Sequence, residues 1–271
     1  MPSQKQSKRR RQQAKNAPPP VRARSQRRRA SPRVLIGAAV VAALIVIGIV
    51  LGVVLTGGSS SPTSSAASTG SLTNALPGAS DVEEQLKGIP QSGDVLGKPS
   101  AQVTMIEYID LQCPYCQQFE TAAMPLIIDK YVRPGKAKVE ARVIAILGPD
   151  SQTGREAAVA AGEQDKMFNF SQILYVNQGA ENTGWLDDAM IESAAASVPG
   201  LEVQPVLDAA GSSTVSDALA EVDRQAAADA VDSTPTIFVG KSGEKLQEVT
   251  LTSPTDPSAV EAAIDAALGG S

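Results

Sequence analysis

The stretch VTMIEYIDLQCPYCQQF, residues 103–119, joins a buried strand to a helix that carries two cysteines. Residues 103–109 are rich in β-branched and apolar side chains, which predicts a buried strand. Apolar residues at helical spacing then predict a helix from Cys113 to about Tyr131. Cys113 and Cys116 are the only cysteines in the chain. Three positions apart on a helix, they lie on one face and close enough to form a disulfide.

The rest of the chain combines strand and helix signals in an order that indicates the fold class. A second buried strand after the first helix requires a parallel crossover, whereas the last two strands, separated by a Gly-containing turn, predict an antiparallel hairpin. The predicted elements after the first helix are a strand at 139–147, helices at 155–164, 166–177, 186–197, 203–210 and 215–229, strands at 236–239 and 246–251, and a helix at 257–268. This order predicts an α/β fold with a mixed central sheet and an all-helical subdomain inserted at about 150–230.

The first 55 residues differ in composition from the rest. Residues 1–33 hold 12 of the 24 Lys and Arg and no acidic residue, so the remainder, with 29 Asp and Glu, carries a formal charge of −17. Residues 34–55 form an uncharged, apolar run of 22 residues. In a helix, ~20 such residues span a bilayer core of ~30 Å. We therefore expect one transmembrane helix at 34–55 in the cell membrane, with a cytoplasmic basic tail and an extracytoplasmic remainder.

Two other interpretations of this segment stay open. A cleaved signal peptide also begins with a basic and then an apolar region, but its apolar region usually covers only ~7–15 residues. Arginine runs also bind nucleic acid. Next to a membrane span, topology and attraction to anionic lipid explain the basic tail, so we expect a lipid bilayer and no nucleic acid as its partner.

Residues 56–80 consist mainly of Gly, Ser, Thr, Ala and Pro. This composition is too small and polar to bury a core, and it predicts a flexible linker. The folded extracytoplasmic domain is then predicted to cover 81–271.

The CPYC motif indicates redox chemistry. A disulfide between Cys113 and Cys116 closes a loop too small to restrain the unfolded chain much, which argues against a structural role. Structural zinc takes four protein ligands from Cys and His, and this chain has no His and no third Cys, although Glu107 and Asp110 could supply oxygens. At a helix N-terminus, unpaired N–H groups and the helix dipole favour a thiolate at Cys113.

Several motifs resemble the DsbA family of bacterial extracytoplasmic thiol oxidoreductases, which have the thioredoxin fold. The match runs from about Glu83 to the C-terminus. Besides CPYC between strand and helix, the matching motifs are Gly88-Ile-Pro-Gln, Leu96-Gly97, Asn177-Gln178, Thr183-Gly184-Trp185 and Ser233-Thr234-Pro235-Thr236. The resemblance implies a thioredoxin fold and protein thiol-disulfide oxidoreductase activity. The sequence calls for no separate small-molecule cofactor.

The resemblance assigns roles to three residues around the disulfide. Cys113 is expected to be the exposed, attacking thiol, and Cys116 the thiol that resolves the mixed disulfide. Glu107 matches an acid beneath the disulfide that accepts or relays a proton, with a pKa raised by desolvation. The period-2 alternation of a strand could instead turn Glu107 outward.

Four further residues are expected to face the substrate. Thr234 and Pro235 match a cis-proline loop that packs against the disulfide and pairs with an extended substrate segment. Pro114 and Tyr115, between the cysteines, are the other expected substrate-binding residues. Tyr115 stands where many oxidases of the family have His, and Thr before the cis-proline also occurs in isomerases, so the redox direction is left open.

The resemblance also implies partners. Reduced exported proteins are the expected substrates, and a quinone-linked membrane oxidase is the expected partner that reoxidises Cys113 and Cys116. Two alternatives remain: a reductase or isomerase of the same fold, and a non-catalytic binding module whose disulfide stays closed.

Overall fold

The computed structural model describes residues 68–269. The predicted basic tail (1–33), the predicted transmembrane helix (34–55) and residues 56–67 of the predicted linker lie outside the described residues. Each helix found between residues 68 and 269 is too short or too polar to cross a membrane.

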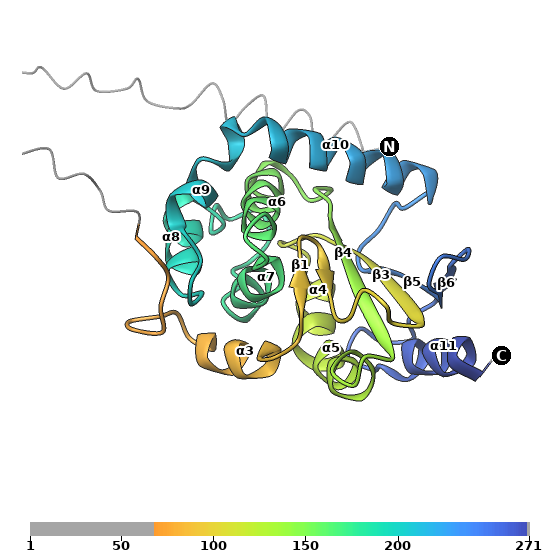
Figure 1. Cartoon of the computed structure of the whole chain (residues 1–271). Coiled ribbons are helices and arrows are strands. Elements are labelled where there is room, and N and C mark those ends of the chain that lie inside the picture. The colour runs from red at the N-terminus through yellow and green to blue at the C-terminus, as the bar shows by residue number, and fades with distance from the viewer. Residues whose placement is uncertain (1–67, 270–271) are drawn as a thin grey trace, which may run out of the picture. The chain divides into compact units, whose positions relative to one another are not determined.

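A mixed sheet of six strands lies at the centre of the described domain (Figure 1). The strand order is β1-β2-β4-β3-β5-β6; β3 and β4 are parallel, and all other neighbours are antiparallel. The strands are β1 (Gln91–Ser92), β2 (Val95–Leu96), β3 (Val103–Ile109), β4 (Ala137–Val143), β5 (Thr236–Lys241) and β6 (Gln247–Val249). The parallel pair and the closing β5–β6 hairpin confirm the predicted mixed sheet.

Helices precede, interrupt and follow the sheet. The helical stretch after β3 comprises α4 (Pro114–Gln118), the π-helical η1 (Phe119–Ala123), α5 (Met124–Ile127) and η2 (Ile128–Val132). The flanking helices are α3 (Ala79–Leu86) and α11 (Ser258–Gly269). All regular structure between β4 and β5 is helical: α6 (Pro149–Gly162), α7 (Met167–Val176), α8 (Asp188–Ala196), α9 (Val203–Leu207), the 3-10 turn η3 (Ala209–Gly211) and α10 (Ser213–Ala228). Helices α6 to α9 gather beside the sheet, and α10 leads the chain back toward β5 (Figure 1).

Strand β3 has hydrophobic contacts on both of its faces. All seven of its residues are buried. Met105 and Ile109 belong to the main core on one face. Ile106 and Tyr108 form a smaller cluster on the other face, packed against Val222 of α10. A strand buried on both faces is a nearly continuous apolar run, which is why its bounds could be predicted from composition.

The second predicted strand, 139–147, was placed too late in the chain, because β4 ends at Val143. The apolar residues that follow form a loop instead. In that loop the backbone N–H groups of Ile146 and Leu147 donate to the carboxylate of Asp110, at 2.9 and 3.1 Å. A buried side-chain acceptor therefore replaces a sheet partner for this backbone.

The predicted linker 56–80 does not extend to residue 80 in the structure. Its end docks on the helical subdomain through backbone hydrogen bonds: Gly70 N–H donates to Leu201 O at 2.8 Å, and Gly200 N–H donates to Gly70 O at 3.1 Å. Thr69 forms an isolated antiparallel bridge with Glu202. Residues 68–71 are therefore part of the folded domain, and we refer to them as the docked segment.

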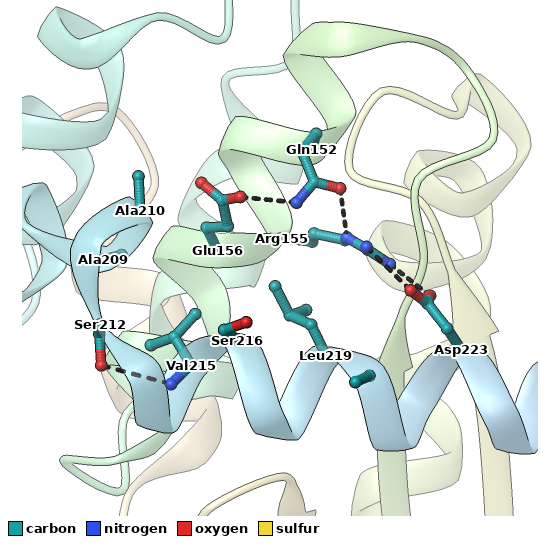
Figure 2. A pocket seen from close by; sticks show the side chains of 11 residues that line it. Gln152, Arg155, Glu156, Ala209, Ala210, Ser212, Val215, Ser216, Leu219 and Asp223 are labelled. Atoms are coloured by element: carbon teal, nitrogen blue, oxygen red, sulfur yellow. Dashed lines mark hydrogen bonds and ion pairs between the residues drawn. The ribbon is translucent and has the colours of Figure 1, made fainter.

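Helices α6 and α10 enclose a cavity of about 290 Å³ (Figure 2). Across it, the Arg155 guanidinium donates to both carboxylate oxygens of Asp223, at 2.6 and 3.1 Å. Arg155 Nε also donates to Gln152 Oε1 at 2.8 Å. These polar side chains bond to one another, so they link α6 to α10 across the cavity. The cavity therefore offers no reactive group of its own.

We predict that Gly70→Ala destabilises the domain. A Cβ at this position would lie 2.2 Å from Val198 O and 2.4 Å from Ala195 O, both rigid backbone atoms. Overpacking of this kind typically costs ~1–3 kcal/mol. Thermal unfolding should show the loss. Gly211→Ala is the control, since an added Cβ there meets no atom within 4 Å; equal melting temperatures for both variants would contradict the docked segment.

Candidate active site

The two cysteines occupy the start of α4. Cys113 is the N-cap residue, Pro114 is the first helical residue, and Cys116 lies in the first turn. The backbone N–H of Cys116 donates to Cys113 Sγ at 3.4 Å. The structure has both residues as free thiols, and both are buried: Cys113 is 4% exposed and Cys116 is 0% exposed. The expectation that Cys113 is exposed was wrong, but it is the less buried of the two.

The surroundings shift the pKa values of the two thiols in opposite directions. The pKa of Cys113 is lowered to about 6, first by a hydrogen bond from the Cys116 side chain and then, against the effect of burial, by the Thr234 side chain and the backbone N–H groups of the first helical turn. Burial raises the pKa of Cys116 well above its usual value. At neutral pH one thiol is therefore mainly thiolate while its neighbour keeps its proton.

The loop before β5 brings Thr234 and Pro235 to the cysteines. In its thiol form, Cys113 Sγ donates to the carbonyl oxygen of Thr234 at 3.3 Å, across 121 positions of sequence. The peptide bond between Thr234 and Pro235 is cis, as the family resemblance implied. Tyr115 lies on the outer side of the same site, with 60% of its surface exposed.

Glu107 points inward from β3 and is 1% exposed, so the outward alternative was wrong. Burial raises its pKa well above the usual range, and the nearby Glu120 raises it further. Glu120 is 2% exposed and lies one helical turn after Cys116. Burial raises the pKa of Glu120 to about 7, against hydrogen bonds from Glu107 and Gln172. Glu107 is therefore the carboxyl group that keeps its proton when Glu120 ionises. No sequence motif pointed to Glu120.

Asp110 and Gln178 support the loop that leads into CPYC, and sequence reasoning gave neither of them this role. The Asp110 carboxylate, 0% exposed, accepts hydrogen bonds from Gln112 N–H at 2.9 Å and Ser151 Oγ at 2.7 Å, in addition to the two from the loop after β4. Gln178 Nε2 donates to the carbonyl oxygens of Leu111 at 2.8 Å and Cys113 at 3.2 Å. The matching motif at Asn177-Gln178 was the available signal, but its partners are 65–67 positions away.

Between residues 68 and 269, no group of three or more Cys, Asp and Glu side chains is arranged to hold a metal ion. The reactive groups of the site are thiols and carboxylic acids, which support thiol-disulfide exchange and proton transfer.

A strand that leads into CPYC at a helix N-terminus, facing a cis-proline loop, defines the class of thioredoxin-fold proteins. A family model described as Thioredoxin matches residues 91–266, and the chain belongs to that family.

Similar proteins agree with this assignment. The probable disulfide bond formation protein D of Bacillus cereus is 24% identical over 147 residues, which cover 53% of this chain and 68% of that protein. BdbD from Bacillus subtilis, in its oxidised form, aligns with a TM-score of 0.57 at 20% identity, covering 66% of this chain and 97% of that one. Wolbachia pipientis alpha-DsbA1 aligns with a TM-score of 0.55 at 20% identity, covering 69% and 96%. The chain is a DsbA-like, thioredoxin-fold protein thiol-disulfide oxidoreductase.

We predict that Cys116→Ala raises the pKa of Cys113 by roughly one unit, because it removes the hydrogen bond that lowers this pKa most. Thiolate absorbance near 240 nm across a pH titration measures the effect. Cys116→Ser is the matched control, since its hydroxyl keeps a donor at the same place, and its midpoint should stay near that of the reduced wild type. A Cys116→Ala midpoint that also stays near 6 would contradict the assignment.

We predict that the domain loses stability as the pH rises from about 4.5 to 7. Glu107 and Glu120 have folded-state pKa values above the usual 4.5, so in this window the folded state binds more protons than the unfolded state. The free energy of unfolding should fall by about 1–3 kcal/mol across it, because ionisation of Cys113, whose folded-state pKa of about 6 lies below the usual 9.0, offsets part of the carboxyl effect above pH 6. Glu107→Gln removes one of the two buried titrating carboxyl groups, so the fall should be smaller in this variant. Urea titrations at pH 4.5 and pH 7 measure both; an equal fall in the free energy of unfolding of the two proteins would refute the paired-acid account.

Proposed function

We propose that this chain oxidises pairs of cysteines in exported proteins through a Cys113–Cys116 redox disulfide. The observation that carries the proposal is the opposite shift of the two thiol pKa values, with Cys113 at about 6 and Cys116 well above its usual value. Interactions that stabilise the Cys113 thiolate favour the reduced form of the pair. They therefore make its disulfide a stronger oxidant and make Cys113 a better leaving group.

The proposed reaction transfers two electrons from the substrate to the cysteine pair. A substrate thiolate attacks Cys113 Sγ, the Cys113–Cys116 bond breaks, and Cys116 leaves and takes up a proton. A second substrate thiolate then attacks the substrate sulfur of the mixed disulfide, which releases Cys113 as a thiolate and leaves the substrate oxidised. Glu107 is the proposed proton donor to Cys116, since its raised pKa keeps it protonated in the folded protein.

The substrate is proposed to lie over the start of α4. Pro114 and Tyr115 border the cysteines, and Thr234 and Pro235 provide the backbone next to which an extended segment would bind. The exposure of Tyr115 supports this placement, because its ring is available for apolar contact with an unfolded chain.

The proposed location is outside the cytoplasmic membrane, with the domain anchored by residues 34–55 and the basic tail 1–33 inside. The uncharged run of 22 residues and the charge asymmetry around it support this topology. A quinone-linked membrane oxidase is the proposed partner that removes the two electrons from the reduced pair. The substrates proposed are reduced exported proteins, whose compartment permits disulfides.

The test is to measure the reduction potential of the full chain in detergent micelles against glutathione, together with oxidation of a reduced, unfolded substrate protein. We expect a disulfide more oxidising than glutathione and substrate oxidation that falls to background in Cys113→Ser. A very low potential without turnover would instead identify a non-catalytic binding module. A mid-range potential with reduction of substrate disulfides would identify a reductase or isomerase.

A further inference from the structure

The segment between α10 and β5, residues 230–235, presents Thr234 to Cys113, and its hydrophobic packing lies at its start, where Val231 packs against the smaller cluster of β3. Asp232 and Ser233 are exposed, and Thr234 is only half-buried. The hydroxyl of Thr236 donates to Ser233 O at 2.8 Å, a bond made at the end of the segment itself. The position of this segment therefore depends on how its two ends are attached to the sheet.

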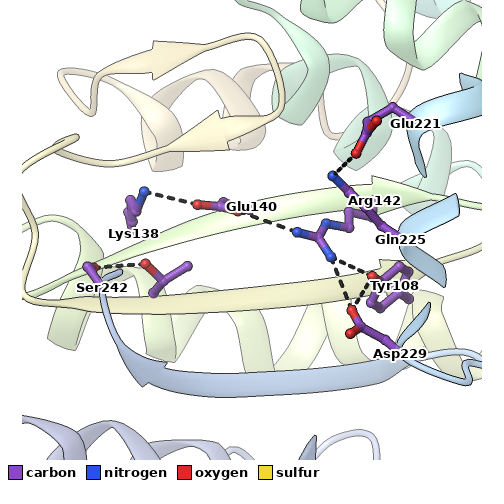
Figure 3. Close-up of polar contacts among 9 residues, drawn as sticks. Tyr108, Lys138, Glu140, Arg142, Glu221, Gln225, Asp229 and Ser242 are labelled. Atoms are coloured by element: carbon purple, nitrogen blue, oxygen red, sulfur yellow. Dashed lines mark hydrogen bonds and ion pairs between the residues drawn. The ribbon is translucent and has the colours of Figure 1, made fainter. Parts of the chain in front are cut away.

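Both ends are attached to Tyr108 of β3, and Figure 3 shows the first of these attachments, to Asp229. At the start of the segment, Tyr108 Oη donates to Asp229 Oδ2 at 2.6 Å. Asp229 is the residue that ends α10, and Ala230 after it has a left-handed φ of 54°. At the end of the segment, the backbone of Tyr108 is the antiparallel partner of Thr236, the first residue of β5. Residues 229 and 236 are thus bound by the side chain and the backbone of Tyr108.

Arg142 of β4 completes this arrangement. Its guanidinium donates to Tyr108 Oη at 2.5 Å and forms an ion pair with Asp229 at 3.3 Å. Tyr108 is 0% exposed, and the edge-to-face contact of its ring with Phe238, at 6.1 Å between centroids, holds the ring in place. The Asp229 side chain is itself 39% exposed, but a hydrogen bond to an ionised carboxylate is stronger than one between neutral groups, and the buried Tyr108 hydroxyl has little water to bond instead.

We propose that Tyr108 is a positioning residue for the active site: its hydroxyl, through Asp229, fixes the 230–235 segment so that Thr234 meets Cys113. Tyr108 itself touches neither thiol. It acts on the opposite face of β3 from Glu107 and reaches the cysteines only through the segment that it holds. The inference concerns the same cysteine pair as the proposed function, but it does not depend on the direction of electron transfer.

The titration of Cys113 reports on this geometry. Hydrogen bonding from the Thr234 side chain is one of the causes that lower the pKa of Cys113. Burial and the bond to Asp229 raise the pKa of Tyr108 to about 12, so its hydroxyl stays a neutral donor throughout the range in which Cys113 titrates. A change in the Cys113 titration on removal of the hydroxyl therefore arises from position and not from a new charge.

The test compares Tyr108→Phe, Asp229→Ala and the double variant in the full chain. Tyr108→Phe keeps the ring and its contact with Phe238 and removes only the hydroxyl. Asp229→Ala removes the acceptor from a helix C-terminus, where a negative charge is unfavourable, so folding should be retained. Each single variant should raise the pKa of Cys113 and lower, about threefold, the equilibrium constant with which the disulfide oxidises glutathione. The double variant should show no further change.

Thr104→Val is the matched control. Thr104 lies on the same face of β3, is 5% exposed, and its hydroxyl is bonded to Ser242 Oγ at 2.8 Å, near the other end of β5. It should leave both quantities unchanged. The proposal is overturned by an unchanged Cys113 pKa in Tyr108→Phe, or by an equal change in Thr104→Val. If Tyr108→Phe does not fold, Asp229→Ala alone decides in the same way. The proposed function is tested independently of these variants, by the reduction potential and the substrate oxidation of the wild-type chain.

Discussion

The burial of β3 on both faces is the constraint on which the active site depends. A slip of one residue would exchange the two faces of the strand, so the register of β3 with β4 and β5 is strongly fixed. That register sends Glu107 to the side of the main core and Tyr108 to the side of α10. The strand ends at Ile109. The next residue, Asp110, accepts hydrogen bonds from backbone N–H groups of two loops, the one before α4 and the one after β4. Cys113 comes three residues after Asp110, so the position of the cysteines depends on these hydrogen bonds.

The chemistry of the site comes from placing two identical side chains in different surroundings. Cys113 lies at a helix start, where N–H groups and the thiol of its neighbour stabilise a negative charge. Cys116, one turn on, has no exposed surface and lies in the main core. The charge is stabilised by groups already in place before substrate arrives, so no reorganisation is needed when the thiolate forms. The segment with Thr234 contributes to this only because the sheet holds both of its ends.

The sequence was informative where a local pattern has one structural meaning. Residues 103–109 could be recognised as buried and CPYC as a helix start, and the Gly-containing turn predicted the β5–β6 hairpin. Strands β1 and β2, of two residues each, are too short to show periodicity. The bonds of Gln178 and Tyr108, and those of Asp110 to Ser151 and to the loop after β4, join positions far apart in the chain, so no window of sequence contains both partners. The docked segment was missed because its hydrogen bonds use backbone groups, which carry no side-chain signal.

The docked segment also limits how far the thiols can work from a bilayer. A free chain from residue 56 to residue 80 has 25 residues and, at ~3.4 Å each, a maximal span of ~85 Å. Because residues 68–71 are bound to the helical subdomain, only residues 56–67 lie between the proposed anchor and the folded domain, and twelve residues span at most ~40 Å. The connecting segment is thus about half as long as the linker 56–80 that the composition predicts. In the proposed reaction, the cysteine pairs of a substrate would have to come to a height above the lipid surface no greater than this span plus the width of the folded domain.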